Sequence, residues 1–587
     1  MIPRRFLWVE GFLFLFAALC IGRLFYWQVL QYDRFAEAAK NQTESTVNIG
    51  ASRGKILASD NSILVSNQKA YLLFAVLPEI KKQIKENETY DDLIERIGNS
   101  LTPILTAERL QYREKPTEAD KEDLKKQIYA EITQQLKQPN LIWVPLSKKL
   151  GQEAKEKIEK LKIKSIGFQE DSKRFYPEGS IGANLLGFVA KDSQGNDKGY
   201  VGLEGFYDDK LAGRSGQLVQ EIDALGRPIL ISPSQGLGAL DGANLLTTID
   251  RTVQFTLEKK IKAGVERYGA KAGAALVIDT KTSGVLASVS VPSFNLLDPL
   301  GNDQNYKNLG VSEIYEPGSI FKIVTVASGL DSGAINAKTI CPCKGPIRIS
   351  GYEIQTSDNK YHPKSTLTNI LQHSDNIGAA FISEKIGKDN FINYIKKFGF
   401  GELTGVDLQG EEAGIIKESQ NWSKVDLLTS GFGQGLSVTA LQMVNALAAI
   451  ANDGKLMRPY LVKEIRSANS TVEFGPKEVR QVVSKETANL LKQLLFAAVE
   501  GGEARNLIPH GYRVGGKTGT AQVPIPGGYS TKTVASFVGF GPLENPRFAM
   551  IVVLFEPSAS IYAADTSEPL FFEILKGLYP YWGIPVR

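Results

Sequence analysis

The stretch Tyr315-Glu-Pro-Gly-Ser319-Ile-Phe-Lys322-Ile-Val-Thr-Val326 places a single lysine inside an otherwise apolar segment. A helix that is apolar on every face is a buried one, so the stretch predicts a buried helix beginning at Ser319. Ser319 and Lys322 are three residues apart and therefore lie on the same face of that helix. Burial disfavours the charged form of a lysine and lowers its pKa, which makes Lys322 a candidate base. The stretch therefore predicts a serine nucleophile activated by lysine.

Two further motifs follow in order within the same predicted domain, Ser374-Asp-Asn376 and Lys517-Thr518-Gly519-Thr520. Taken alone, the short motifs are weak signals, because each of the first two recurs. Ser-x-x-Lys occurs four times, at Ser52/Lys55, Ser66/Lys69, Ser319/Lys322 and Ser357/Lys360, and Ser-Asp-Asn occurs three times, from Ser59, Ser357 and Ser374. Only the Ser319 copy begins a buried-type helix, and only the Ser374 copy lies between two apolar helical runs. The ordered set, rather than any one motif, predicts a single site.

The composition describes a multidomain globular protein. A chain of 587 residues exceeds what one hydrophobic core supports, so two or three domains are expected. The net charge is only +4 and basic residues alternate with acidic ones, so nucleic acid is not an expected partner. Cys341 and Cys343 stand too close for an easy disulfide and are expected as packed or free thiols, since their spacing to a histidine does not fit a zinc finger. No metal or cofactor is expected.

The N-terminus predicts a membrane anchor. Residues 6–30 are predominantly apolar, although Glu10 and Arg23 interrupt them, and their length matches the ~20 residues of a membrane-spanning helix. No small-x-small cleavage site follows the apolar run, so an uncleaved anchor is favoured over a removed signal peptide. Arg4 and Arg5, on the short side of the apolar run, favour a cytoplasmic N-terminus, with the bulk of the protein on the other side of the membrane.

Strand and helix patterns alternate along the rest of the chain. A strand-rich region begins near residue 46, a charged helical region extends over 78–161, and strands return over 166–230. A Pro/Ser/Gly-rich segment, 232–242, is the expected linker between domains.

Beyond the linker, the pattern predicts α+β architecture with helices beside a mostly antiparallel sheet. The expected elements are a strand at 244–249, a helix at 252–268, a hairpin at 274–289, a helical pair over 366–387 broken at 373–376, helices at 439–454 and 485–500, strands at 512–523, 533–540 and 547–555, and a closing helix at 571–578. Thr439 and Gln442 predict a capping box at the start of the helix at 439–454.

The chain resembles the class B penicillin-binding proteins, membrane-anchored D,D-transpeptidases of peptidoglycan, over nearly its whole length. The resemblance rests on the three motifs and on further segments: Arg53-Gly-x-Ile56, Asp223-Ala-Leu-Gly-Arg227, Thr248-Ile-Asp250, Gly433-Gln-Gly-Leu-Ser437, and Ala535–Phe540 with Asn545-Pro-Arg547. The last pair is closest to division-type, FtsI-like members. The stretch 562–568 departs from them, because a glycine pair usual there is missing.

The resemblance implies a single N-terminal transmembrane helix, a β-rich pedestal (dimerisation) domain with a helical insertion, and a penicillin-binding/β-lactamase-like transpeptidase domain whose antiparallel sheet has helices on both sides. The expected limits are 1–5 for the cytoplasmic tail, 6–30 for the anchor, 31–235 for the pedestal and 243–587 for the transpeptidase domain. No transglycosylase domain is apparent. The implied partners are therefore a membrane glycosyltransferase of the FtsW type and other divisome proteins, besides the lipid bilayer.

The resemblance also implies roles for the site residues. Ser319 would attack the penultimate D-Ala carbonyl of a stem peptide, and Lys322 would take the hydroxyl proton. Ser374 would relay a proton towards the leaving amine, Asn376 would hold the substrate amide, and Lys517 would keep Lys322 neutral and attract the terminal carboxylate.

The remaining implied contacts come from the third motif. The hydroxyls of Thr518 and Thr520 would bind the substrate carboxylate, and Gly519 would let the strand backbone approach closely. The backbone N–H groups of Ser319 and Thr520 would form the oxyanion hole. β-Lactams would acylate Ser319 as inhibitors.

Other functions stay open at this point. A β-lactamase would share the acylation site, but it predicts a small exported domain without an anchor or pedestal. A penicillin-sensing receptor or a non-catalytic scaffold would be non-enzymatic, and an elongation-type transpeptidase would differ only in its cellular role. A Ser-His-Asp hydrolase is disfavoured because the chain has only three histidines. The acceptor amine, diaminopimelate or lysine, and the oligomeric state are not determined by the sequence.

Overall fold

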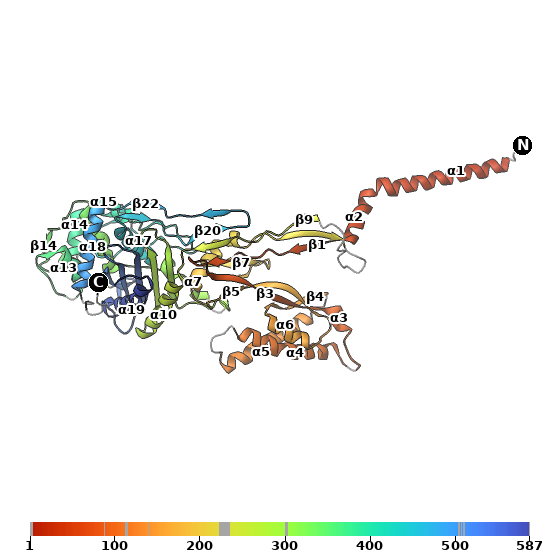
Figure 1. Ribbon diagram of the computed structural model, residues 1–587, viewed down its shortest axis with the longest axis horizontal. Coiled ribbons are helices and arrows are strands. Elements are labelled where there is room, and N and C mark those ends of the chain that lie inside the picture. Colours follow the sequence, from red (N-terminus) through yellow and green to blue (C-terminus); the bar gives the residue numbers. More distant parts are fainter. Residues whose placement is uncertain are drawn as a thin grey trace. The chain divides into compact units, whose positions relative to one another are not determined.

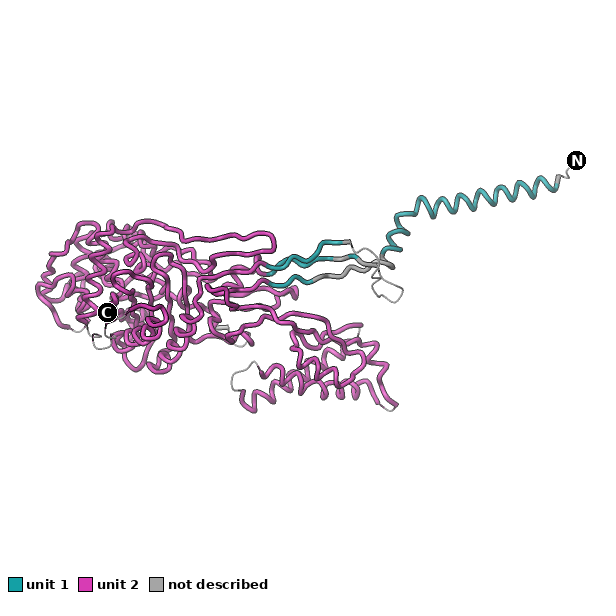
Figure 2. The backbone as a smooth tube through the Cα atoms, viewed as in Figure 1, with its two compact units in different colours: residues 1–53, 212–242 teal, residues 54–211, 243–587 magenta. Residues whose placement is uncertain are grey.

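The computed structural model describes residues 4–86, 88–111, 116–139, 141–221, 235–299, 303–357, 359–502, 505, 508 and 511–585. Figure 1 shows their helices and strands, coloured along the sequence. The described residues form two compact units, drawn in different colours in Figure 2. The first contains residues up to Arg53 and the segment Ala212–Gly242, and the second contains Gly54–Leu211 and Ala243–Arg587. The segment Asp223–Arg227, which contributed to the family resemblance, lies outside the described residues.

The first unit begins with the apolar helix that the sequence predicts. Helix α1 (Arg4–Phe25) continues through the turn η1 (Tyr26–Leu30), and the 26 residues Arg5–Leu30 are long and apolar enough to cross a membrane. Helix α2 (Tyr32–Thr43) follows and leads into strand β1 (Glu44–Ile49). This strand pairs antiparallel with β8 (Gly216–Glu221), which in turn pairs with β9 (Gln235–Leu237). The expected linker 232–242 therefore contributes a strand, because its backbone groups pair with β8.

The C-terminal part of the second unit is built on a five-stranded antiparallel sheet with helices on both faces, which confirms the predicted class. Its strand order is β12 (Val285–Val291), β11 (Ala272–Asp279), β25 (Phe548–Phe555), β24 (Gly528–Gly541) and β23 (Gly515–Ile525). Successive side chains of a strand point to opposite faces. Accordingly, Ala274, Leu276 and Ile278 enter one core, whereas Ala275 and Val277 enter another.

These two cores are covered by different helices. Helices α10 (Arg251–Arg267) and α19 (Ser567–Tyr581) pack on one face of the sheet, and the fully buried α17 (Ala440–Ala451) packs on the other. The same side as α17 holds α12 (Lys322–Asp331), α13 (Leu367–Gln372) and α14 (Asn376–Ile386), while α18 (Lys485–Glu500) packs against α12, α13 and α17. The predicted capping box at Thr439 and Gln442 is present at the start of α17. Strand β23, which holds the third motif, is left at the edge of the sheet.

A second, mixed sheet joins residues from the two halves of the sequence within this unit. Strand β10 (Asn244–Thr247) pairs parallel with β2 (Ile56–Leu57) and antiparallel with β20 (Val462–Arg466). The sheet continues from β2 into the long strand β3 (Ile63–Val76) and from β20 into β21 (Thr471–Glu473). Strand β3 pairs with β5 (Ile166–Phe175) over ten positions and with β4 (Trp143–Leu150) at its far end.

The predicted helical region forms an insertion with its own core. Helices α4 (Tyr90–Leu110) and α5 (Glu118–Leu136) each begin with a capping box, and α3 (Leu77–Lys81) and α6 (Gln152–Lys160) complete the layer. In α5 the buried residues recur every four positions, at Leu124, Ile128, Ile132 and Leu136, as expected for one helical face. The prediction of helices throughout 78–161 was wrong at β4, because pairing with β3 overrides local sequence preference there.

The shorter elements of the described residues connect these layers. They are η3 (Asp303–Tyr306), η4 (Gly318–Phe321), η5 (Ser419–Asn421), η7 (Ala563–Asp565), α7 (Ala183–Leu186), α8 (Gly202–Phe206), α9 (Asp208–Leu211), α11 (Leu309–Ser312), α15 (Lys388–Lys397), α16 (Lys424–Ser430), β6 (Phe188–Lys191), β7 (Asp197–Tyr200), β13 (Ile314–Tyr315), β14 (Ile340–Cys341), β15 (Ile347–Ile349), β16 (Tyr352–Ile354), β17 (Ser365–Thr366), β18 (Val438–Thr439), β19 (Lys455–Met457) and β22 (Glu478–Gln481).

The core of the insertion makes a first prediction. Ile128→Ala, at a residue that is 1% exposed, is expected to lower the free energy of local unfolding by about 2–5 kcal/mol, because a cavity replaces packed methylenes. Hydrogen exchange of the α5 amides in the full-length protein measures this change. Ile142→Ala, the same exchange at a residue that is 70% exposed, is the control and should change that free energy by no more than about 0.5 kcal/mol. Equal effects at the two positions would contradict the assignment of Ile128 to the core.

Candidate active site

Ser319 and Lys322 lie together at the start of the predicted helix. Ser319 occupies a 3-10 turn, η4, and Lys322 is the first residue of α12. The helix therefore begins three residues later than the sequence predicts, but the spacing still brings the two side chains into contact. Ser319 Oγ and Lys322 Nζ are 2.9 Å apart. Ser319 is half-buried, whereas Lys322 is fully buried.

The second motif closes around the same amine. Lys322 Nζ donates to the carbonyl oxygen of Ser374 at 2.5 Å and to Asn376 Oδ1 at 2.8 Å, and it lies 3.2 Å from Ser374 Oγ. The amide of Asn376 is fixed in this orientation because its Nδ2 donates to the carbonyl oxygen of Gln355 at 2.9 Å. A neutral amine has two N–H groups and one lone pair. Since the Ser374 carbonyl and Asn376 Oδ1 can only accept, they occupy the two N–H groups, and the lone pair is available to the hydroxyl of Ser319.

The surroundings favour the neutral form of this amine. Burial lowers the pKa of Lys322 well below its usual value, and the positive charge of Lys517 lowers this pKa further. The nearby carboxylate of Asp375 acts in the opposite direction. A lowered pKa is what the predicted role of Lys322 as the base for Ser319 requires, and that role remains a prediction.

Ser374 stands at the break between α13 and α14 in a left-handed backbone conformation, with φ of 53°. Few residues other than glycine adopt this conformation. Here it accompanies a geometry in which both the carbonyl and the hydroxyl oxygen of Ser374 lie near Lys322. The following residue, Asp375, caps α14 by accepting from the backbone N–H groups of Ile377 at 2.8 Å and Gly378 at 3.2 Å.

The third motif lies on the edge strand β23, which packs against η4. Lys517 is buried, and its Nζ lies 3.0 Å from Thr518 Oγ1. Thr518 and Thr520 are two positions apart and therefore share one face of the strand, where both are half-buried. The hydroxyl of Thr520 accepts from the backbone N–H of Ala563 at 3.0 Å. The predicted oxyanion-hole and carboxylate-binding roles of these residues remain predictions.

Two glycine contacts allow these segments to approach. A Cβ on Gly519 would lie 2.9 Å from both the carbonyl oxygen of Pro317 and Ile320 Cγ2, and 2.7 Å from Ser536 Oγ. A Cβ on Gly433 would lie 2.1 Å from the carbonyl oxygen of Gly318, whose own N–H donates to the carbonyl of Gly433 at 3.0 Å. Both sites therefore exclude a larger residue.

Sequence reasoning missed Glu316. This residue is 8% exposed, and its carboxylate accepts from the backbone N–H of Gly435 at 3.0 Å and from the hydroxyl of Tyr529 at 3.1 Å. It thus connects the segment before Ser319 to the Gly433–Ser437 segment and to the β23–β24 hairpin. Burial raises the pKa of Glu316. A signal was present in the sequence, since a carboxylate stands three residues before Ser319, where the helix predicted to be buried begins.

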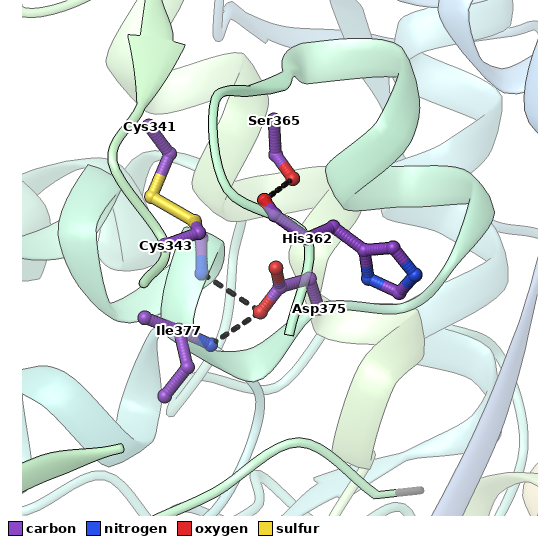
Figure 3. Close-up of a disulfide and its surroundings, with 7 residues drawn as sticks. Cys341, Cys343, His362, Ser365, Asp375 and Ile377 are labelled. Carbon is purple, nitrogen blue, oxygen red and sulfur yellow. Dashed lines mark hydrogen bonds between the residues drawn. A yellow bond between two sulfur atoms is a disulfide. The ribbon is translucent and has the colours of Figure 1, made fainter. Parts of the chain in front are cut away.

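The prediction that Cys341 and Cys343 are unpaired was wrong. The two residues form a disulfide between the end of β14 and the next loop, and both are buried (Figure 3). One intervening residue separates their Cα atoms by 5.3 Å, which is within the ordinary range for a disulfide, so a separation of two does not exclude the bond. Figure 3 also shows Asp375 and Ile377 beside the disulfide. The expectation of free thiols was wrong because sequence separation alone does not determine whether two cysteines can form a disulfide.

The histidines and the Ser357/Lys360 copy of the first motif have no predicted catalytic role. His362 and His373 stack with ring centroids 4.2 Å apart, and His373 is exposed. His510 lies outside the described residues. The Ser357/Lys360 copy of the first motif follows Gln355, whose backbone carbonyl accepts a hydrogen bond from Asn376.

Comparison with known proteins agrees with this geometry. Residues 273–576 match the family model described as "Penicillin binding protein transpeptidase domain", and residues 48–246 match "Penicillin-binding Protein dimerisation domain". The chain is 30% identical to stage V sporulation protein D of Bacillus subtilis over 573 residues, which cover 96% of this chain and 84% of that protein. It is 30% identical to peptidoglycan D,D-transpeptidase FtsI of Escherichia coli over 439 residues, covering 74% and 72%.

A solved structure shows the same fold over most of the chain. The crystal structure of a peptidoglycan synthetase from Bifidobacterium adolescentis is similar with a TM-score of 0.69 and 26% sequence identity, covering 93% of this chain and 98% of that one.

The contribution of Lys517 to the site makes a second prediction. Lys517→Gln removes a positive charge that lowers the pKa of Lys322, so that pKa should rise. Because the neutral amine is the base, acylation increases with pH through this pKa, and the acidic limb of the acylation pH profile should move to higher pH. The rate of acylation by a penicillin, followed by stopped flow over a range of pH, gives the position of this acidic limb. Lys532→Gln, at an exposed lysine of β24, is the control and should leave the acidic limb at its wild-type pH. An acidic limb that does not move in Lys517→Gln would contradict the electrostatic role of Lys517.

The close approach at Gly519 makes a third prediction. Gly519→Ala should slow acylation by about a hundredfold, because the new methyl group displaces β23 from the turn that holds Ser319. Gly528→Ala in the same hairpin is the matched control, since a Cβ there meets no atom within 4 Å. The melting temperature of both variants shows whether they are folded. Unchanged acylation in folded Gly519→Ala would contradict the need for this contact.

Proposed function

The chain belongs to the family of penicillin-binding protein transpeptidases, and from that membership we propose that it cross-links peptidoglycan stem peptides through a Ser319 acyl-enzyme during septal wall synthesis. The enzyme class itself is that of a serine-type peptidoglycan D,D-transpeptidase of the class B type. The observation that supports the assignment of residues is the contact of one buried lysine, whose pKa is lowered by burial and by Lys517, with Ser319, Ser374 and Asn376.

In the proposed reaction, Ser319 Oγ forms a bond to the carbonyl carbon of the penultimate D-Ala of a donor peptide. The lone pair of Lys322 Nζ takes the hydroxyl proton as this bond forms. Negative charge develops on the carbonyl oxygen, which the backbone N–H groups of Ser319 and Thr520 bind. An oxyanion-hole donor of this kind contributes about 3–4 kcal/mol in a serine protease.

Collapse of the tetrahedral intermediate breaks the peptide bond and leaves the acyl group on Ser319. The proton held by Lys322 passes through the hydroxyl of Ser374, 3.2 Å away, to the nitrogen of the departing D-Ala. The acceptor amine then attacks the acyl-enzyme, its proton returns along the same path, and Ser319 is regenerated. β-Lactams acylate Ser319 by the first half of this sequence.

The substrate is held by the third motif and by Asn376. The edge strand β23 offers backbone groups on which an extended peptide can lie, which is a common mode of peptide recognition. Lys517 with the hydroxyls of Thr518 and Thr520 binds the terminal carboxylate, and Asn376 holds the substrate amide.

A division role is supported by the likeness to FtsI of Escherichia coli and by the segments Ala535–Phe540 and Asn545–Arg547. The proposed partners are a membrane glycosyltransferase of the FtsW type and other divisome proteins. Arg4 and Arg5 support a cytoplasmic N-terminus for α1, with the enzyme domain outside the bacterial inner membrane. The predicted domain limits, 1–5, 6–30, 31–235 and 243–587, complete the proposal.

A sporulation role is the second candidate, because the likeness to stage V sporulation protein D covers 96% of this chain. Depletion in the native bacterium separates the two roles. Filamentous growth without septa supports division, whereas normal growth with heat-sensitive spores supports sporulation. Rounded cells would indicate an elongation-type enzyme instead.

Labelling with a fluorescent penicillin tests the site assignment. The wild-type protein should form a stable adduct, and Ser319→Ala should abolish it because no nucleophile remains. Ser52→Ala, at another Ser-x-x-Lys copy, is the control and should label normally. Rapid release of the label would indicate a β-lactamase, and no labelling of folded wild-type protein would contradict both enzymes. Cross-linking of synthetic stem peptides that end in D-Ala-D-Ala, with diaminopimelate or lysine acceptors, then identifies the acceptor amine.

A further inference from the structure

The helical insertion presents an apolar cluster to solvent at one end of its sheet. The cluster consists of Ile84, Leu141, Ile142 and Trp143, which are 39%, 51%, 70% and 42% exposed. We call these four residues the insertion patch. Single exposed apolar side chains are ordinary on a protein surface. Here Leu141, Ile142 and Trp143 are consecutive, and Ile84 follows α3, whose first residue binds the backbone of Ile142; such a group indicates a binding surface.

Three segments meet at this patch. The backbone N–H of Leu77 donates to the carbonyl of Ile142 at 2.9 Å, which joins α3 to the start of β4. The backbone N–H of Val76 donates to the carbonyl of Ser165, also at 2.9 Å, and Gln83 Nε2 donates to the carbonyl of Lys164 at 2.7 Å. The chain after α3, the start of β4 and the segment before β5 are thereby held side by side.

Exposed lysines border the patch. The segments 77–86 and 160–166 contain six lysines against two glutamates, a net charge of +4. All six lysines are exposed: Lys81, Lys82, Lys85, Lys160, Lys162 and Lys164. Of the two glutamates, Glu79 is already paired with Lys82 at 2.7 Å. The border of the patch is therefore basic.

Side-chain contacts fix parts of this surface in place. The ring of Trp143 packs on that of Phe74, with centroids 5.5 Å apart. The ammonium of Lys81 lies over the ring of Tyr90, 5.4 Å from its centroid. Contacts with neighbouring rings therefore restrict Trp143 in the patch and Lys81 at its border. This restriction lowers the conformational entropy that binding would cost.

We propose that the insertion patch binds the surface of a bilayer that contains anionic lipids. Tryptophan and aliphatic side chains enter the boundary between headgroups and acyl chains, while surrounding lysines keep their charge at the headgroups. Anionic lipids attract such lysines within a Debye length of the surface. Protein interfaces also have a polar rim, so the dependence of binding on anionic lipid is what separates a bilayer from a protein partner. The same chain contains the membrane-length helix α1, so a bilayer is an available partner.

Lipid quenching in proteoliposomes tests the proposal with the full-length protein. In a Cys20→Ser background, Ile142→Cys is labelled with an environment-sensitive fluorophore, because Cys20 is the free cysteine and Cys341 and Cys343 are bonded to each other. Brominated phosphatidylglycerol in the bilayer should quench this probe at least about threefold more than the matched control Val472→Cys, which is 51% exposed on β21. The same measurement in phosphatidylcholine should lose most of the difference.

Charge reversal provides the second arm. Lys160→Glu with Lys164→Glu should reduce the quenching at position 142 by at least about twofold, and 1 M salt should do the same, because it shortens the Debye length to about 3 Å. Equal quenching at 142 and 472, or no dependence on anionic lipid, would overturn the proposal. Shielding of the probe that rises with protein density but not with anionic lipid would also overturn it and indicate a second copy of the chain.

Discussion

The site depends on keeping one lysine amine uncharged while it contacts two serines. A charged ammonium at Lys322 would have no lone pair to take the proton of Ser319, however well the two atoms were placed. Burial alone supplies part of the required pKa shift, and Lys517 supplies more. The two carbonyl-type acceptors, at Ser374 and Asn376, then orient the neutral amine. Burial and Lys517 therefore lower the pKa of the lysine, while separate contacts with Ser374 and Asn376 orient its amine.

This requirement explains why the site is assembled from distant segments. No helix can surround one of its own side chains, so the groups around Lys322 must come from the α13–α14 break and from strand β23. Their approach is limited by backbone contacts at Gly433 and Gly519, where even one methyl group would collide. The five-stranded sheet, packed on both faces, holds the edge strand against the turn of Ser319. Rigid packing around the site keeps the reacting groups in position.

The local sequence pattern predicted secondary structure correctly where a helix is determined by its own apolar spacing and capping residues. The helix at 485–500, the capping box at Thr439 and the broken helical pair at 366–387 follow from apolar spacing and capping residues, and the structure confirms them. The errors arose where another part of the chain decides the outcome. Strand β4 exists because it pairs with β3, and β9 because it pairs with β8. The disulfide between Cys341 and Cys343 depends on backbone geometry that sequence separation does not specify.

The sequence by itself determined the order of the three motifs, the apolar setting of Lys322 and the membrane-length N-terminal helix, because each is a property of neighbouring residues. Only the tertiary structure decided which atoms meet at the amine, that Glu316 joins three segments around the serine, and that the Gln355 carbonyl fixes Asn376. Those contacts join residues far apart in the chain. Their geometry is set by the packing of the whole unit, and no local pattern contains it.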